Sequence, residues 1–213
     1  DLLGHHPSTI VWCGHDAPDQ ADTTRPAPSL LEQQRPNWNR TVLDRSIRRA
    51  LRRTDSSRPV IAHTGVLPSP PVVEDAATHL RFGWYGGRAD DLTEFLRRSP
   101  RAGGFVAAFG ARSVPDIDPE LLGLDPTRWP RPDWSRLTGD PDGELEVLLG
   151  LFPPDEHPDL ATWADATRSH QAEVLRIQIE AMRRRKYQPC GGFALDRLLD
   201  AEPCISGSLL DHD

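Results

Sequence analysis

Polar side chains follow the apolar run at the start of the chain. The stretch HHPSTIVWCGHDAPDQ covers residues 5–20, and its apolar part ends where His15, Asp16 and Ala17 enter a polar loop. In parallel α/β proteins, the loops that follow the strands hold the reacting groups. A carboxylate there can donate or accept a proton, whereas a methyl group can do neither. The chemistry available to this loop therefore depends first on Asp16, which can transfer a proton, and on Ala17, which cannot.

Short apolar runs alternate with helical patterns along the chain. Continuous apolar runs bounded by Gly, Pro or Asp predict strands that are buried on both faces, as in a parallel sheet. They are residues 8–13, 59–64, 79–84, 104–109 and, more weakly, the stretch GGFAL from Gly191. Amphipathic periodicity and terminal charges predict helices at residues 41–53, 90–98 and 160–186. This alternation implies right-handed crossovers and an α/β fold.

Two long irregular segments follow predicted strand ends. Residues 17–37 are rich in Pro, Asp, Gln and Thr, and residues 115–158 contain nine prolines. Both are flanked by elements of the same alternating series, so we interpret them as loops on the functional rim rather than as interdomain linkers.

Composition excludes several classes of function. The 213 residues carry a formal net charge of −7, which argues against non-specific nucleic-acid binding. The basic run RRRK from Arg183 is interpreted as a solvated helix end. No apolar run approaches the roughly 18 residues of a membrane helix, so we expect a soluble protein, cytoplasmic or secreted. The three widely spaced cysteines indicate neither a disulfide framework nor a zinc site.

The first motif resembles a signature of glycoside hydrolase family 2, in its β-mannosidase-like branch. That signature reads HPS…W.GN.E, and the matching residues here are His6, Pro7, Ser8, Trp12, Cys13 and Gly14. In the family, the motif is the fourth barrel strand and its final Glu is the general acid/base. The resemblance places that Glu on Ala17, with His15 and Asp16 replacing the two amides before it.

The family's later motifs follow in order. DSSRPVIAHTG from Asp55 resembles the fifth strand, and THLRFGWYGG resembles the sixth, whose His and Trp line the sugar site. Those two residues would be His79 and Trp84. GGFVAAFGARSVP resembles RFVSEFG.QS.P, the seventh strand, and the nucleophile Glu of that strand falls on Ala108.

The last part of the chain resembles the family's final long helix and eighth strand. LDAEPCISGSLLDH from Leu199 resembles NDCWPAISWSLIDY, although Leu199, Glu202 and Gly207 replace an Asn, a Trp and a second Trp. The resemblance therefore implies that residues 1–213 are one partial domain, about strands four to eight of a TIM (β/α)8 barrel. Residues outside this chain would complete the barrel, and upstream β-sandwich domains are expected. Expressed alone, residues 1–213 are expected to expose strand edges and aggregate.

The resemblance implies a glycosidase fold without its catalytic pair. Retaining glycosidases need two carboxyl groups about 5–5.5 Å apart, and both positions are alanine here. We therefore expect an inactive barrel, without a cofactor, that binds β-linked sugars or serves as a scaffold. The expected sugar-contacting residues are Trp12, His15, Asp16, His79 and Trp84.

The alternative is an active exo-β-glycosidase with relocated carboxylates. Asp16 is the nearest surrogate, although neighbouring side chains on a strand point to opposite faces. The other candidates are Asp19, Asp22, Glu74, Asp75, Asp116 and Asp118.

A metal site and a thiol nucleophile are weaker hypotheses. Several histidines and a carboxylate could converge at the rim, namely His5, His6, His15, Asp16, His63 and His79. No HxH or HExxH spacing places two ligands on one element, so no metal is predicted. Cys13 matches a cysteine of the family motif and is interpreted as a packing residue.

Overall fold

A computed structural model gives the fold of the chain. It describes residues 6–7, 9, 11–15, 42–64, 78–84, 87–116, 118–134, 144–195, 197–199, 204–205 and 207–210. Within these ranges the chain is mixed α/β, with two open parallel sheets that are consistent with part of a barrel.

Five short strands form the two sheets of the described chain. β1 (Trp12–His15) pairs with β2 (Val60–His63), and β3 (Thr78–Leu80), β4 (Phe105–Phe109) and β5 (Gly192–Phe193) form the second sheet in that order. All pairs are parallel and consecutive along the chain. The parallel alternation that the apolar runs predict is therefore confirmed.

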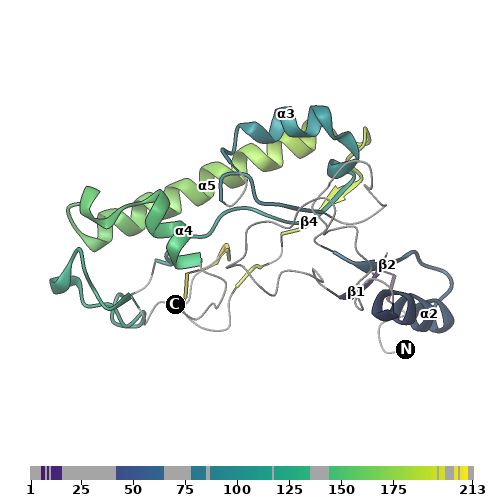
Figure 1. Ribbon diagram of the computed structural model, residues 1–213, viewed down its shortest axis with the longest axis horizontal. Coiled ribbons are helices and arrows are strands. Elements are labelled where there is room, and N and C mark those ends of the chain that lie inside the picture. The colour runs from purple at the N-terminus through teal and green to yellow at the C-terminus, as the bar shows by residue number, and fades with distance from the viewer. Residues whose placement is uncertain are drawn as a thin grey trace.

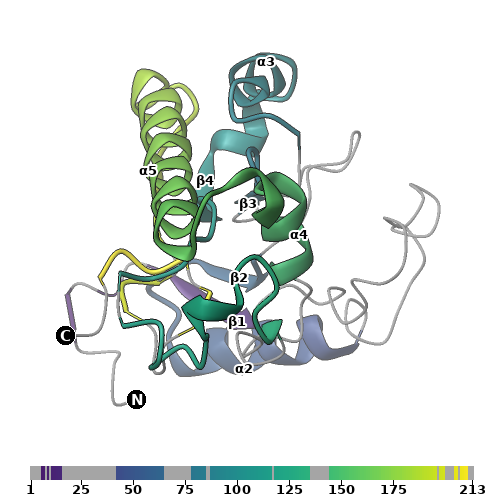
Figure 2. The same ribbon diagram turned by 90° about the vertical axis from the view of Figure 1, so that its left-hand side faces the viewer.

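In the described part of the chain, four α-helices connect and cover these strands. They are α2 (Asp44–Thr54), α3 (Asp91–Arg98), α4 (Glu144–Leu151) and α5 (Leu160–Arg184). Short 3-10 helices lie at Pro100–Gly103, Pro126–Arg128 and Pro154–Glu156. Figures 1 and 2 show α3 and α5 on one side of β3 and β4, whereas α2 lies against β1 and β2 at the other end of the molecule.

The long helix α5 begins at a polar cap and buries one face. The Asp159 carboxylate accepts a hydrogen bond from the Thr162 N–H at 2.8 Å, which holds the pKa of Asp159 below its ordinary value. Beyond this cap, the buried residues of α5 recur three or four positions apart, as one face of a helix requires. A single helix can therefore cover the ends of two strands.

Two apolar clusters lie against α5. One gathers around Trp163, which has no exposed surface, and includes Trp84 and Leu148. The other joins α3 to β4 through Leu92, Leu96, Val106 and Phe109. At about 25 cal/mol per Å² of apolar area removed from water, these clusters are the main stabilising contribution of the fold.

The sequence-based element boundaries needed three corrections. The first strand begins at Trp12, four residues after the predicted start at Ser8. Residues 82–84 form a turn rather than the end of a strand, so Trp84 lies beyond β3. The segment 115–158 is not wholly irregular, because it contains α4, whose apolar residues occur on all sides. In the described ranges, the structure has no helix that combines the length and the apolarity needed to cross a membrane.

Candidate functional site

The predicted nucleophile position lies beside His79. In the β3–β4 ladder, His79 aligns with Ala108 and Leu80 aligns with Phe109. Aligned residues of neighbouring strands project from the same face of a sheet. Both residues are buried, His79 with 7% and Ala108 with 2% of its surface exposed. The structure therefore brings together two residues that lie in separate sequence motifs, and it places a methyl group next to the imidazole.

Polar side chains of α5 fix the segment that follows β4. Gly110 adopts a φ of +111°, and a Cβ atom there would lie 3.1 Å from the Leu175 side chain. The Gln171 amide donates to the Ala111 carbonyl at 3.2 Å and accepts a hydrogen bond from the Ser113 hydroxyl at 2.9 Å. The backbone of residues 110–113 is therefore held in one position by a buried polar side chain.

The turn after β3 is fixed by the same helix. The Gln178 amide donates to the Phe82 carbonyl at 2.6 Å, and His170 Nε2 lies 2.9 Å from the Gly83 carbonyl oxygen. Trp84 is 5% exposed and packs in the cluster around Trp163. Its ring lies among apolar side chains, which leaves little of it open to a sugar. A role for Trp84 in contacting sugar stays a prediction.

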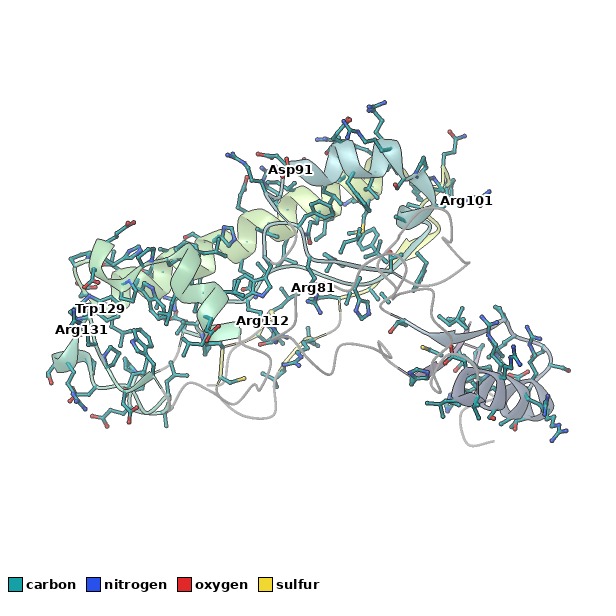
Figure 3. All side chains as sticks on the ribbon, in the orientation of Figure 1. Arg81, Asp91, Arg101, Arg112, Trp129 and Arg131 are labelled. Atoms are coloured by element: carbon teal, nitrogen blue, oxygen red, sulfur yellow. The ribbon has the colours of Figure 1, made fainter. Side chains whose placement is uncertain are left out.

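Two arginines follow the ends of β3 and β4, and the sequence analysis did not single them out. Arg81 comes directly after β3, and Arg112 comes three residues after β4; Figure 3 shows both near the middle of the molecule. Arg112 is 6% exposed and stands where the family pattern RFVSEFG.QS.P has Gln. This difference from the motif is the sequence signal that could have identified Arg112. It puts a buried arginine four residues after Ala108 in the chain.

Polar side chains join the first two motifs. The Asp55 carboxylate accepts hydrogen bonds from the Trp12 indole at 2.9 Å and from the Arg58 guanidinium at 2.6 Å. Arg58 also donates to the carbonyls of Thr9 at 2.5 Å and His6 at 3.2 Å. The HPS…W and D.SRPV motifs therefore form one hydrogen-bonded network. This network fixes the orientation of Trp12, the first residue of β1.

Asp55 is the centre of that network. Its carboxylate also accepts hydrogen bonds from the Ser57 hydroxyl at 2.6 Å and from the Ser57 N–H at 2.8 Å. The Ser57 hydroxyl, then Trp12, the Ser57 N–H and Arg58 hold the pKa of Asp55 well below its usual range. The network thus requires an ionised carboxylate.

His15 closes β1 against α2. Its Nε2 atom lies 2.8 Å from Asp44 Oδ1, and Asp44 is the first residue of α2 and is 8% exposed. His15 also aligns with His63 across the β1–β2 pair. Strand ends of this kind carry the chemistry in parallel α/β folds, so the His15–Asp44 pair belongs to the candidate site.

Several sequence-predicted residues cannot be placed. Asp16 and Ala17 lie outside the described residues, as do the surrogate acids Asp19, Asp22, Glu74 and Asp75. Asp116 and Asp118 are described, and both are exposed. Within the described ranges, no group of three or more His, Cys, Asp and Glu side chains could hold a metal ion.

A cavity of about 320 Å³ lies beyond the end of β4. It is lined mainly by apolar side chains of residues 114–126 and of the first turns of α5. Arg168 stands at its edge, ion-paired with Asp165 and lying 3.5 Å from Asp116. The mainly apolar lining of this cavity differs from the polar side chains at the strand ends, and none of the predicted sugar-contacting residues that the structure describes lines it.

Comparison with known proteins finds likeness in structure. The chain resembles a β-D-mannosidase from Dictyoglomus thermophilum, with a TM-score of 0.70 and 19% identity over 99% of this chain and 25% of that one. A β-glucuronidase from Bacteroides uniformis, a calcium-binding mutant, has a TM-score of 0.48 and 18% identity over 97% of this chain and 20% of its own. The chain spans a quarter or less of either protein. No family model and no curated protein matches it.

Proposed function

We propose that this chain is part of a glycoside hydrolase family 2 barrel of the β-mannosidase-like type, and that it binds β-linked sugars without hydrolysing them. The observation that carries this proposal is the buried methyl group of Ala108, aligned with His79 at the end of β4. The likeness to part of a β-D-mannosidase supports the fold on which the proposal depends.

Retaining hydrolysis requires groups that this site replaces. One carboxylate must attack the anomeric carbon, and a second carboxyl group must protonate the leaving oxygen. Ala108 can form no bond to that carbon, and Ala17 can transfer no proton. A site without both groups is left with binding and positioning, because those two steps provide most of the rate enhancement.

The sugar-binding groups in this proposal come from several strand ends. His79, His15 and Asp16 would form hydrogen bonds with hydroxyl groups, and Trp12 would provide a ring face. The Arg112 guanidinium would donate to ring or hydroxyl oxygens where the family has an amide. Upstream β-sandwich domains of the same protein would flank the barrel, as the resemblance implies.

Two measurements on the full-length protein test the proposal. We expect no turnover of aryl β-mannoside, β-glucoside or β-glucosaminide, and a saturable heat in calorimetric titration with manno-oligosaccharides. Turnover that disappears in Asp16→Asn would instead support relocated carboxylates. A lack of both heat and turnover would leave a scaffold role and would contradict sugar binding.

Restoring the two carboxylates tests whether the site keeps its shape. We expect the double variant Ala17→Glu with Ala108→Glu to gain measurable hydrolysis of an aryl β-mannoside. The matched control is Ala17→Glu with Ala107→Glu, because Ala107 precedes Ala108 on β4 and projects from the opposite face. Equal activity in the two double variants would overturn the assignment of Ala108 to the nucleophile position.

A further inference from the structure

Helix α2 carries a continuous row of arginines. Arg45, Arg48, Arg49, Arg52 and Arg53 occupy positions i, i+3, i+4, i+7 and i+8, which lie along one face of a helix. We call these five residues the arginine row. Four of them are exposed and Arg48 is half-buried, and among the described residues these five line a hollow of about 380 Å³. At 1.5 Å per residue the row is about 12 Å long.

No acidic side chain of the described residues pairs with the arginine row. The one carboxylate on α2, Asp44, is bonded to His15. The helices on the other side of the molecule differ: Arg97 and Arg98 both pair with Glu94 and hold the pKa of that carboxyl at about 2. The row is thus a local positive surface on a chain whose net charge is −7.

The row destabilises the helix that carries it. Like charges three and four positions apart repel, and each member of the row has at least one such neighbour. The opposite face of α2 offers little compensation, since Ile47 and Leu51 are only half-buried. An anionic partner would remove this repulsion. Figures 1 and 2 show α2 at the edge of the molecule, where a partner can approach.

The composition of α2 selects the class of anion. The helix has no aromatic side chain on which a base or a sugar ring could stack. Its row also lacks the apolar anchors that interfacial helices use at membranes. The net charge of −7 opposes binding to long, uniform polyanions such as duplex DNA or an anionic bilayer. A short acidic segment of a protein avoids most of that repulsion.

We propose that the arginine row docks an acidic helical segment of a protein partner, with carboxylates spaced three and four residues apart. Guanidinium groups bind carboxylates through two parallel hydrogen bonds, and a second helix repeats its side chains with the same period as α2. The two helices would then form interhelical salt bridges, as the charged positions beside the core of a coiled coil do.

The test measures binding of fluorescein-labelled, alanine-based helical peptides to the full-length protein. One peptide has glutamates at i, i+4, i+7 and i+11, and a second has the same composition with the glutamates scrambled. We expect the spaced peptide to bind at least threefold more tightly than the scrambled one. The triple variant Arg45→Gln, Arg49→Gln and Arg52→Gln should weaken the binding of the spaced peptide at least tenfold.

A matched triple variant separates the row from net charge. Arg97→Gln, Arg98→Gln and Arg184→Gln removes the same charge from arginines that already pair with Glu94 and Glu180, and it should weaken binding less than twofold. Circular dichroism and the thermal midpoint confirm that both variants fold. Equal losses in the two triple variants, or equal binding of the two peptides, would overturn the proposal. Tighter binding of a 20-base-pair DNA duplex or of phosphatidylserine vesicles, lost in the α2 variant, would overturn it in favour of that other anion.

Discussion

Sheet β3–β4–β5 packs against α3 and α5 through the apolar cluster that includes Leu80, Val106 and Phe109, whereas sheet β1–β2 packs against α2 through a polar network. Of the residues whose burial the structure describes, Asp44 and Val60 are the only buried ones that precede residue 78. The first sheet therefore depends on a few directional hydrogen bonds, and the second depends on area removed from water. Ala108, which the sequence analysis aligns with the family's nucleophile, lies within β4 and so in the second of these environments.

The largest expected effect is in the apolar clusters. Leu96 on α3 has no exposed surface, so Leu96→Ala should lower the free energy of unfolding by about 2–5 kcal/mol. Leu151 is 43% exposed, and Leu151→Ala is the matched control with an expected loss below about 1 kcal/mol. Urea unfolding of the full-length protein measures both. Similar losses in the two variants would contradict the view that buried apolar area stabilises sheet β3–β4–β5.

A smaller effect is expected where α5 meets the turn after β3. Gly83 has a φ of +85°, and a Cβ atom there would lie 2.8 Å from Val174 Cγ2. Gly83→Ala should therefore cost about 1–3 kcal/mol. Gly150 on α4 has no atom within 4 Å of a built Cβ, so Gly150→Ala should stabilise the protein by up to about 1 kcal/mol. Thermal unfolding measures both variants. A shift of the midpoint in the same direction for both would contradict the assignment of steric strain to position 83.

The polar network of the first sheet should respond to a single lost donor. Trp12→Phe keeps a ring but removes the N–H that binds Asp55. We expect amides of β1 and β2 to exchange about fivefold faster, the effect of one net hydrogen bond, while those of β4 are unchanged. Hydrogen exchange measured by mass spectrometry reports both sheets at once. If Trp12→Phe and Asp55→Asn had fully additive effects, the two groups would not be coupled.

The smallest expected effect is a dependence on pH. The folded-state pKa of Asp55 is lowered from 3.8, so its stabilisation is fully present above that value and is lost as the pH falls below it. Exchange in β1 and β2, corrected for its intrinsic pH dependence, should therefore rise between pH 5 and pH 3 more than exchange in β4. Ser57→Ala should make this rise smaller and end it at a higher pH, because the Ser57 hydroxyl is the largest cause of the lowered pKa. Ser56→Ala, a neighbouring exposed serine, should leave the rise unchanged.

The apolar runs were sufficient to predict the order of the strands and their parallel pairing. Continuous apolarity marks a buried strand irrespective of its partner, so β2 and β4 were located within one residue. The start of β1 was wrong because Arg58, far along the chain, holds the lead-in through Thr9 and His6 in a non-strand conformation. Helix α4 was missed because prolines surround it and its apolar residues have no single face.

The candidate site was only partly visible in the sequence. The alignment of His79 with Ala108 follows from two motifs that were each identified. The Asp55 network and the anchoring by Gln171 and Gln178 depend on contacts between distant segments, which no local pattern encodes. Arg112 could have been noticed, because it replaces an amide within an otherwise matching motif.

The polar contacts of α5 have a consequence for biosynthesis. Gln171 and Ser113 are 58 residues apart, and Gln178 and Phe82 are 96 residues apart. While the protein is being translated, β3 and β4 therefore leave the ribosome well before the helix that covers them. At about 5–20 residues per second, that delay lasts several seconds. During this interval the apolar residues of both strands are exposed to water, so nascent chains stalled before α5 should be a preferred target for chaperones that bind apolar segments.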